Sequence, residues 1–465
     1  MMDARSDGLR RSKNVRRSAS TEVTKATFPS RAWERVKLSY AIAVSISIRR
    51  QHVNKKTIII LGGGVGGLVF ANELRHKLPH EHRVVLIEKN HVHAFAPSFL
   101  WLMTGDRTPE RITKSIASLT RSGIEVIQAE VKNIDISTRT VFTSQGPMTY
   151  DYVVVALGAE LAPESIPGLA QSAYSFYTFE ETNRLQQALT QFNGGNIAVV
   201  VCSLPYKCPG APHEGAMLIA DYFQRRGLRH KINIDLYTPE PQPMPVAGPQ
   251  LGEAVKQMLA SKGISFHPLH KLSSVDIQKT QLLFDAKEPV RYDLLIAIPP
   301  HRAPGIAREA GLANETGWIP VDRSTLKTKF ENVYAIGDIS SISIPGRWKP
   351  DVPMMLPKAG VFAHVQAEIV AERIADEIRG RTPTAEFCGT GYCMLEAGEG
   401  LAGFAFGDFF AQPSPRLELR TLGRAWHLGK VLLEQWWLSP LGIRRTVLRT
   451  AIRLGAKALK IPVSV

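Results

Sequence analysis

Residues 57–67 read Thr57-Ile58-Ile59-Ile60-Leu61-Gly62-Gly63-Gly64-Val65-Gly66-Gly67, a β-branched run that leads into a glycine-rich turn. The apolar run predicts a buried parallel strand. Gly62, Gly64 and Gly67 match the G-x-G-x-x-G spacing, in which the first glycine allows the turn, the second lets the backbone approach a pyrophosphate, and the third lets a helix pack close to the strand. The stretch therefore predicts a dinucleotide-binding fold.

The residues that follow extend this prediction. A helix is expected from Val65 to Lys77, with its N-terminal N–H groups directed at the phosphates. Glu88 ends a second strand about 20 residues on, where an acid accepts a hydrogen bond from a ribose hydroxyl. An acid at that position favours FAD or NAD over NADP.

The charge of the chain is concentrated at its two ends. The 465 residues carry a formal net charge of +15. Residues 1–56 hold 14 Lys/Arg and 4 Asp/Glu, and residues 435–465 hold 6 Lys/Arg and no acid. Residues 57–434 are nearly neutral, with 37 basic and 38 acidic side chains. This distribution argues against a nucleic-acid groove in the folded part and favours attachment of an end to an anionic surface.

The apolar and cysteine patterns limit the class of protein further. No apolar run approaches the ~18–20 residues of a membrane-spanning helix. The four cysteines are Cys202, Cys208, Cys388 and Cys393, a spacing unlike a secreted disulfide scaffold or a zinc ribbon, so no metal site is expected. Residues 1–56 have no packed-core pattern, and we expect a disordered extension, a transit-like segment or a mis-assigned start.

A second α/β unit begins near residue 178. Residues 196–201 predict a buried strand, after which a nucleotide-binding domain would place another glycine-rich loop. Residues 202–214 instead read Cys-Ser-Leu-Pro-Tyr-Lys-Cys-Pro-Gly-Ala-Pro-His-Glu, and Pro205 and Pro209 remove backbone donors that a pyrophosphate would need. The loop offers a thiol with an acid six residues later, and a helix is expected over residues 215–226.

Two later stretches complete the expected flavin site. Residues 332–338 predict a strand that ends in Gly337-Asp338, where the acid either accepts from a ribityl hydroxyl or caps a helix. Lys358 precedes a long helix that ends at residue 378, and a lysine there opposes the helix dipole, so we expect it to serve an anionic neighbour such as a reduced isoalloxazine. The residues expected to bind the cofactor are Gly62, Gly64, Gly66, Gly67, Glu88, Lys89, Val131, Ala156, Gly158, Gly337, Asp338 and Lys358.

The C-terminal region predicts strands over residues 391–396 and 401–406, then a basic amphipathic helix over about residues 441–460. Arg445, Arg449, Arg453, Lys457 and Lys460 share one arc of a helical wheel and apolar side chains the other. This pattern favours a helix lying in a membrane interface, with Trp436 and Trp437 at headgroup depth. The alternative is a helix that packs on the protein with a solvated basic face.

The pattern over residues 57–440 resembles the sulfide:quinone oxidoreductases and the flavin subunit of flavocytochrome c sulfide dehydrogenase, among the FAD-dependent pyridine nucleotide-disulfide oxidoreductases. The stretches that carry the resemblance are residues 207–214, 335–338 and 357–360, together with Cys393. The resemblance implies that Cys208 and Cys393 are a redox pair, that Glu214 is the catalytic acid or base, and that Lys358 lies near the flavin pyrimidine. Since no cysteine precedes Cys202, it also implies non-covalent FAD and a two-cysteine mechanism.

The expected fold is α/β: two Rossmann-like domains, arranged as in glutathione reductase, with a C-terminal α+β region. The FAD-binding domain is expected over residues 57–165 with 318–380, the second domain over 166–317, and the C-terminal region over 381–465. Cys202 and Cys388 are expected to be inert thiols.

The implied reaction is oxidation of sulfide or a related sulfur compound, with electrons passed through FAD to a membrane quinone. Phe362 and Tyr392 are candidates for the quinone site. A peripheral location is implied on the cytoplasmic face of the plasma membrane, or on the mitochondrial inner membrane in a eukaryote. Three alternatives remain: a type II NADH:quinone dehydrogenase, a non-catalytic flavoprotein sensor, and a flavin subunit that passes electrons to a cytochrome partner. The sequence leaves a homo-oligomer open.

Overall fold

The computed structural model describes residues 55–349, 351–461 and 463. The expected N-terminal extension falls almost wholly outside the described residues. The chain divides into the units Met1–Asn54 and Lys55–Val465, and everything below concerns the second unit.

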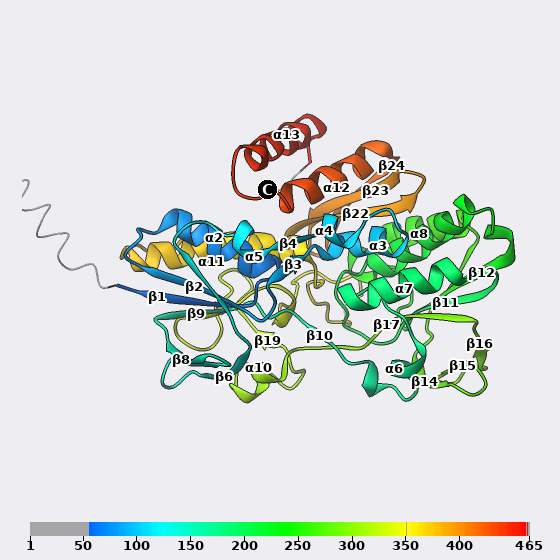
Figure 1. Ribbon diagram of the computed structural model, residues 1–465, viewed down its shortest axis with the longest axis horizontal. Helices are drawn as coiled ribbons and strands as arrows, with labels where there is room; N and C mark the ends of the chain where they lie inside the picture. Colours follow the sequence, from blue (N-terminus) through cyan, green and yellow to red (C-terminus); the bar gives the residue numbers. More distant parts are fainter. Residues whose placement is uncertain (1–54, 350, 462, 464–465) are drawn as a thin grey trace, which may run out of the picture. The chain divides into compact units, whose positions relative to one another are not determined.

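A five-stranded parallel sheet forms around the glycine-rich stretch (Figure 1). In spatial order its strands are β20 (Val333–Ala335), β9 (Tyr152–Val155), β1 (Thr57–Leu61), β2 (Arg83–Glu88) and β5 (Ile124–Gln128). Alternate residues of β1 enter two hydrophobic clusters, one on each face, because the sheet is covered on both sides. Helices α2 (Val65–Lys77) and α11 (Gly360–Ile378) pack side by side on one of these faces.

A second parallel sheet carries the cysteine loop, residues 202–210. Its order is β13 (Ile264–His267), β12 (Ile232–Tyr237), β11 (Gly195–Val201) and β17 (Leu294–Ile298). The same part of the chain forms helices α7 (Phe179–Gln191), α8 (Ala211–Arg225) and α9 (Pro249–Ser261). Helix α8 begins four residues before the expected start, because Pro212 lies in its first turn, where a missing N–H costs no helical hydrogen bond. Glu214 is therefore a residue of the helix rather than of the loop.

The chain also forms two smaller antiparallel sheets of three strands each outside the two parallel sheets. The first contains β6 (Val131–Asp135), β7 (Thr140–Thr143) and β8 (Gly146–Thr149), and the second contains β14 (Leu272–Asp276), β15 (Gln281–Phe284) and β16 (Val290–Arg291).

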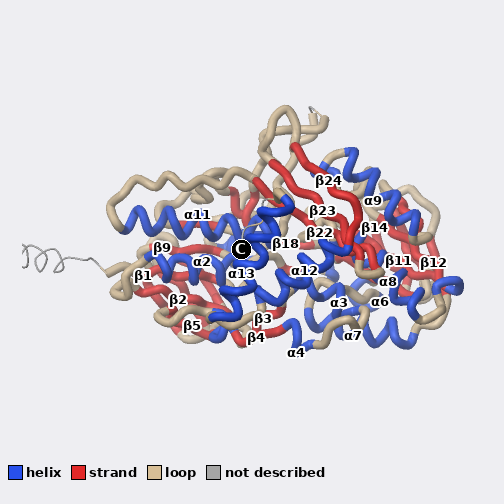
Figure 2. Tube along the Cα trace, turned by 90° about the horizontal axis from the view of Figure 1, so that it is seen from above, coloured by secondary structure: helices blue, strands red, loops and turns tan. Residues whose placement is uncertain are grey.

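The C-terminal region adds an antiparallel sheet and two helices. The sheet contains β22 (Thr390–Gly398), β23 (Leu401–Asp408) and β24 (Arg416–Gly423), and the helices are α12 (Arg424–Trp437) and α13 (Ile443–Leu459). Helix α12 contacts all three strands, and Figure 2 shows it beside them. The expectation that Trp436 and Trp437 lie at headgroup depth is wrong, because both are buried, and Trp437 Nε1 donates to His93 Nε2 over 2.9 Å.

Helix α13 divides its residues differently from the simple wheel. Leu448 and Ile452 pack against the protein, and Arg445 lies over the Trp436 ring, 4.9 Å from its centroid. Ile443 and Leu454 on the opposite face are 85% and 63% exposed. The helix thus holds to the protein with apolar and basic side chains and leaves an apolar strip uncovered. Within the described part of the chain, no helix has the length and apolarity needed to cross a membrane.

Candidate active site

A large cavity brings most of the expected site residues together. Its volume is about 1890 Å³, larger than the ~300–1,000 Å³ of most small-molecule pockets. The walls come from the turn after β1, the segment after β2, the cysteine loop, the turn after β20, the start of α11, strand β22 and helix α12. The cavity therefore has room for an extended dinucleotide together with smaller reactants.

The glycines of the turn have the separate roles that the spacing predicts. Gly62 has φ 102°, and a Cβ there would lie 2.5 Å from the carbonyl oxygen of Ala156. A Cβ on Gly67 would collide with the carbonyl oxygen of Gly62, so only glycine at this position lets α2 pack close to the turn. A Cβ on Gly64 would meet no atom within 4 Å, and Gly64 lines the cavity. Gly66 also lines it but lies against Ile336. The open space at Gly64 fits the close approach of a pyrophosphate.

Glu88 lies beside this turn. Its Oε2 accepts from Gly63 N over 2.7 Å, and its Oε1 accepts from Asn90 N over 2.9 Å. Glu88 and Lys89 both line the cavity. Because Oε1 also accepts from Asn90 Nδ2 over 3.0 Å, Oε2 is the oxygen that keeps a second lone pair, and through it Glu88 could still accept from a ribose hydroxyl.

The remaining cofactor residues from the first sheet separate into two groups. Ala156 and Gly158, after β9, line the cavity. Val131 does not, because it lies in β6 and pairs with Thr143, and Gln128 at the end of β5 lines the cavity instead. The cavity thus reaches the end of β5 and not Val131, so the structure gives no support to a cofactor contact at Val131.

Asp338 is the observation that best fits a flavin dinucleotide. Its Oδ1 is fully buried without a hydrogen-bond partner. Burial raises the pKa of this carboxyl, although Lys207 and Lys358 oppose the shift. A ribityl hydroxyl would supply the missing donor. Together with the open backbone at Gly64, this orphaned oxygen makes the cavity suitable for FAD.

Lys358 lies just before α11, where it can place a positive charge against the ligand. Its Nζ donates to the carbonyl oxygens of Asp338 and Ser340 over 2.6 and 3.1 Å and lies 3.5 Å from the Trp318 ring centroid. Burial lowers the pKa of Lys358 to about 8, partly offset by Asp338, so the side chain is chiefly a cation at neutral pH. Lys358 O also accepts from Cys208 N over 2.6 Å, which joins the lysine to the cysteine loop.

The two cysteines of the expected pair converge from different sheets. Cys208, at the end of the cysteine loop, has a left-handed backbone with φ 55°, and Cys393 lies in β22. A Cβ on Gly210 would lie 3.4 Å from Cys393 Sγ and 3.8 Å from Glu214 Oε2. Both cysteines line the cavity, and Cys208 is exposed. Strained backbone at a cavity-lining nucleophile is typical of functional sites.

All four cysteines are free thiols in this structure. Burial and the Glu214 carboxylate raise the pKa of Cys208 to about 12 and raise that of Cys393 as well, while Lys430 opposes both shifts. Cys202 is buried beside the second sheet, and Cys388 lies near Thr390 away from the cavity lining. Thiolate formation at the pair would therefore need a base within the cavity.

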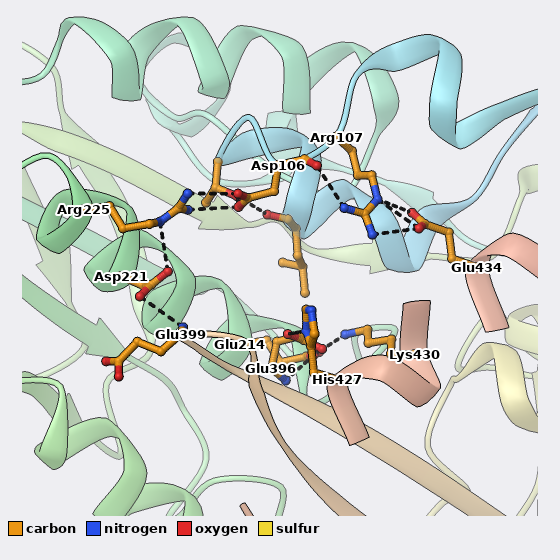
Figure 3. A network of polar contacts seen from close by, with 12 residues as sticks. Asp106, Arg107, Glu214, Asp221, Arg225, Glu396, Glu399, His427, Lys430 and Glu434 are labelled. Carbon is orange, nitrogen blue, oxygen red and sulfur yellow. Dashed lines mark hydrogen bonds and ion pairs between the residues drawn. The ribbon is translucent and has the colours of Figure 1, made fainter. Parts of the chain in front are cut away.

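Glu214 occupies the position of such a base, but it has partners that the sequence did not indicate. Its Oε1 accepts from Lys430 Nζ over 2.5 Å and from Glu396 N over 2.9 Å. His427 Nδ1 lies 2.8 Å from the other carboxylate, at Glu396 Oε2 (Figure 3). Lys430 is separated from Glu214 by 216 residues, so no local pattern could pair them. Polar residues spaced along an otherwise apolar α12 were the available signal.

Aromatic and apolar side chains line another part of the cavity. Phe362 on α11 contacts Phe409 edge to face, with ring centroids 5.1 Å apart, and Tyr392 precedes Cys393 in β22. Phe362, Tyr392, Phe409 and Trp436 all line the cavity. The structure thus brings both quinone candidates to the cavity, next to the helices of the C-terminal region.

Comparisons with known proteins agree with this arrangement. The chain is 27% identical over 373 residues to the mitochondrial sulfide:quinone oxidoreductase of Mus musculus, covering 77% of this chain and 80% of the relative. It is 24% identical to the type II NADH:quinone oxidoreductase of Staphylococcus haemolyticus, covering 76% and 90%. The crystal structure of the sulfide:quinone oxidoreductase from Aquifex aeolicus superposes with a TM-score of 0.75 at 24% identity, covering 87% and 94%, which shows a shared fold.

The resemblance recognised in the sequence is therefore confirmed at the level of the family. The family model described as pyridine nucleotide-disulphide oxidoreductase matches residues 56–361, which is more than half of the chain. The glycine turn and Asp338 lie within the matched residues, and the cavity is lined by those residues together with others from the C-terminal region. The chain belongs to the pyridine nucleotide-disulphide oxidoreductase family and is an oxidoreductase of the flavin-binding type.

Proposed function

We propose that this protein oxidises sulfide with Cys208 and Cys393 as a redox pair and passes the electrons through FAD to a membrane quinone. The observation that carries the proposal is that Cys393 and Glu214 meet beside Gly210, and that Cys208 lines the same cavity, which also holds the glycine turn and Asp338. The similarity to sulfide:quinone oxidoreductases supports it.

The chemistry begins from a disulfide between the two cysteines. Hydrosulfide bonds to one cysteine sulfur, the cysteine–cysteine bond breaks, and the other sulfur leaves as a thiolate. Glu214 takes the proton of the new persulfide. A second thiol or hydrosulfide then removes the sulfane sulfur, which leaves both cysteines reduced. Reforming the disulfide releases two electrons.

Bound FAD would supply the two-electron acceptor between the cysteines and the quinone. Gly64 would face its pyrophosphate, Glu88 a ribose, and Asp338 a ribityl hydroxyl. Lys358 would hold a positive charge beside the flavin, fixed by the carbonyl oxygens of Asp338 and Ser340. The chain offers no cysteine before Cys202, so we infer non-covalent binding.

Quinone would enter from the membrane near α12 and α13. Phe362 and Tyr392 lie in the aromatic part of the cavity that would receive the ring. The uncovered apolar strip of α13, with Ile443 and Leu454 exposed, would enter the lipid interface, and its basic residues would meet anionic headgroups. We infer a peripheral membrane protein, on the mitochondrial inner membrane or a bacterial plasma membrane.

An NADH donor is less well supported. The loop after β11 has prolines at positions 205 and 209, and Tyr206 in the same loop is buried with its hydroxyl 2.9 Å from Glu240 Oε2. A nicotinamide dinucleotide needs free backbone donors at that position. The described residues there supply few.

The experiment that tests the proposal uses serine variants of the purified flavoprotein. Under anaerobic conditions, Cys208→Ser and Cys393→Ser should each abolish bleaching of the flavin by sulfide while FAD stays bound. Cys202→Ser is the matched control, because Cys202 is buried outside the cavity, and it should bleach as the wild type does. Wild-type bleaching rates in the Cys208 variant would exclude the redox-pair role.

A further inference from the structure

Three charged side chains form a buried group behind the cysteine pair. Glu214 and Lys430 form an ion pair in which the side chains are 4% and 9% exposed, and the Glu396 side chain is 2% exposed. Glu396 N donates to the same Glu214 oxygen that Lys430 contacts. One ammonium therefore lies close to two buried carboxylates (Figure 3).

The carboxylate of Glu396 has one oxygen without a hydrogen-bond partner. Glu396 Oε2 lies 2.8 Å from His427 Nδ1, whereas Glu396 Oε1 is fully buried and has no hydrogen-bond partner. Burial raises the pKa of Glu396, and Lys430 and His427 both oppose that shift, which indicates that Lys430 already acts on this carboxylate electrostatically. A buried carboxylate oxygen without a donor is costly, so it marks a place where a donor can arrive.

We propose that Lys430 exchanges between Glu214, beside the cysteine pair, and Oε1 of Glu396, and that the protonation state of His427 decides which carboxylate holds it. Protonated His427 neutralises Glu396, so Lys430 stays on Glu214 and keeps that carboxylate a weak base. Neutral His427 leaves Glu396 with an uncompensated charge, which draws Lys430 away and frees Glu214 to take a thiol proton. His427 is a positioning residue in this scheme, since it acts through Lys430.

Of the four side chains in this group, His427 is the one that is in contact with solvent. Its side chain is 32% exposed, whereas Glu214, Glu396 and Lys430 are buried. Arg107 is already paired with Glu434 at 2.9 Å. The titratable groups that face Lys430 and Glu396 are Glu214 of α8, Cys208 of the cysteine loop, Cys393 of β22, and His427 and Glu434 of α12, with Arg107 after α3 (Phe99–Met103).

The test measures thiol reactivity and contains no sulfide. The FAD-loaded protein, reduced with dithiothreitol and freed of it, is treated with iodoacetamide from pH 5.5 to 8, and alkylation of Cys393 is followed by peptide mass spectrometry. Rates are compared as variant-to-wild-type ratios, which cancel the intrinsic pH slope of the thiol. At pH 8, Glu396→Gln should react about tenfold more slowly than the wild type, because Lys430 then stays on Glu214. At pH 5.5 the two should react equally.

His427→Gln should show the reverse pattern, faster than the wild type at pH 5.5 and equal at pH 8. His267→Gln is the matched control, because His267 is 34% exposed and lies 2.7 Å from Asp235 in another part of the fold. Ratios that do not change with pH in both the Glu396 and His427 variants, or a control that behaves as they do, would overturn the proposal.

The inference rests on the proposed role of Glu214 as the base for the cysteine pair. Its failure is still distinguishable from failure of the proposed function. A protein that oxidises sulfide but shows pH-independent ratios retains the function and loses the switch. A protein with the pH-dependent ratios but no reaction with sulfide retains the switch and loses the function.

Discussion

Replacing Lys430 by methionine should destabilise the protein far more than removing a surface lysine. Methionine keeps most of the volume of the side chain and removes its charge, so Glu214 and Glu396 are left as buried carboxylates without a cation. Removing one partner of a buried pair costs about 3–5 kcal/mol. The matched control is Lys271→Met, since Lys271 pairs with Asp285 at 2.9 Å while the two side chains are 71% and 51% exposed. An exposed pair of that kind contributes about 0–1 kcal/mol.

The assay is urea unfolding of the FAD-loaded variants at pH 7.5, followed by circular dichroism, with the free energy of unfolding taken at a common slope. The Lys430 penalty should shrink as the pH falls, because burial raises the pKa of Glu396 and its protonation removes part of the unpaired charge. A second substitution, Glu214→Gln in the Lys430→Met protein, should recover part of the loss. Equal losses for Lys430→Met and Lys271→Met would refute the buried ion pair as described.

Three further predictions follow from other parts of the fold. Gly64→Ala should fold with wild-type stability but lose FAD affinity, because its Cβ meets only the space expected for the pyrophosphate. Gly67→Ala should lose both stability and FAD affinity, because its Cβ collides with backbone. Thermal unfolding and flavin absorbance separate the two outcomes. Burial raises the pKa of Glu240 from 4.5 to about 7, so the folded state binds more protons than the unfolded state in this window, and stability should fall by roughly 3 kcal/mol as the pH rises through it. Glu240→Gln should remove that slope in urea titrations, and an unchanged slope would exclude Glu240 as its source. Leu454→Glu should reduce co-sedimentation with anionic vesicles without changing sulfide-dependent bleaching, and unchanged co-sedimentation would argue against the α13 strip as the membrane contact.

The sequence predicted the parts of the structure that depend on local spacing. The glycine turn and helix Val65–Lys77 lie where the pattern placed them, because backbone requirements at those positions are local. Helix α12 and strand β24 were not predicted, because α12 mixes buried charges with apolar residues and its partners are far away in sequence. The wrong expectation for Trp436 and Trp437 follows from that omission. Both tryptophans belong to α12, which lines the cavity, and both are buried.

The candidate site divides in the same way. Residues that act through the backbone or through a motif, such as Gly64, Asp338 and Cys208, could be named from the sequence. Lys430 could not, because its role depends on a contact between two helices. The packed side and the exposed apolar strip of α13 also required the structure, since a helical wheel does not show which side packs on the protein.

The most direct test of the central claim is an anaerobic comparison of two electron donors on the wild-type flavoprotein. Stopped-flow absorbance of the bound flavin is recorded after mixing with sulfide or with NADH, and a soluble quinone is then added. We predict rapid bleaching by sulfide, no comparable bleaching by NADH, and recovery of the oxidised spectrum with quinone. Rapid bleaching by NADH with none by sulfide would contradict the account and identify an NADH dehydrogenase, and no bleaching by either would indicate a flavoprotein without this activity.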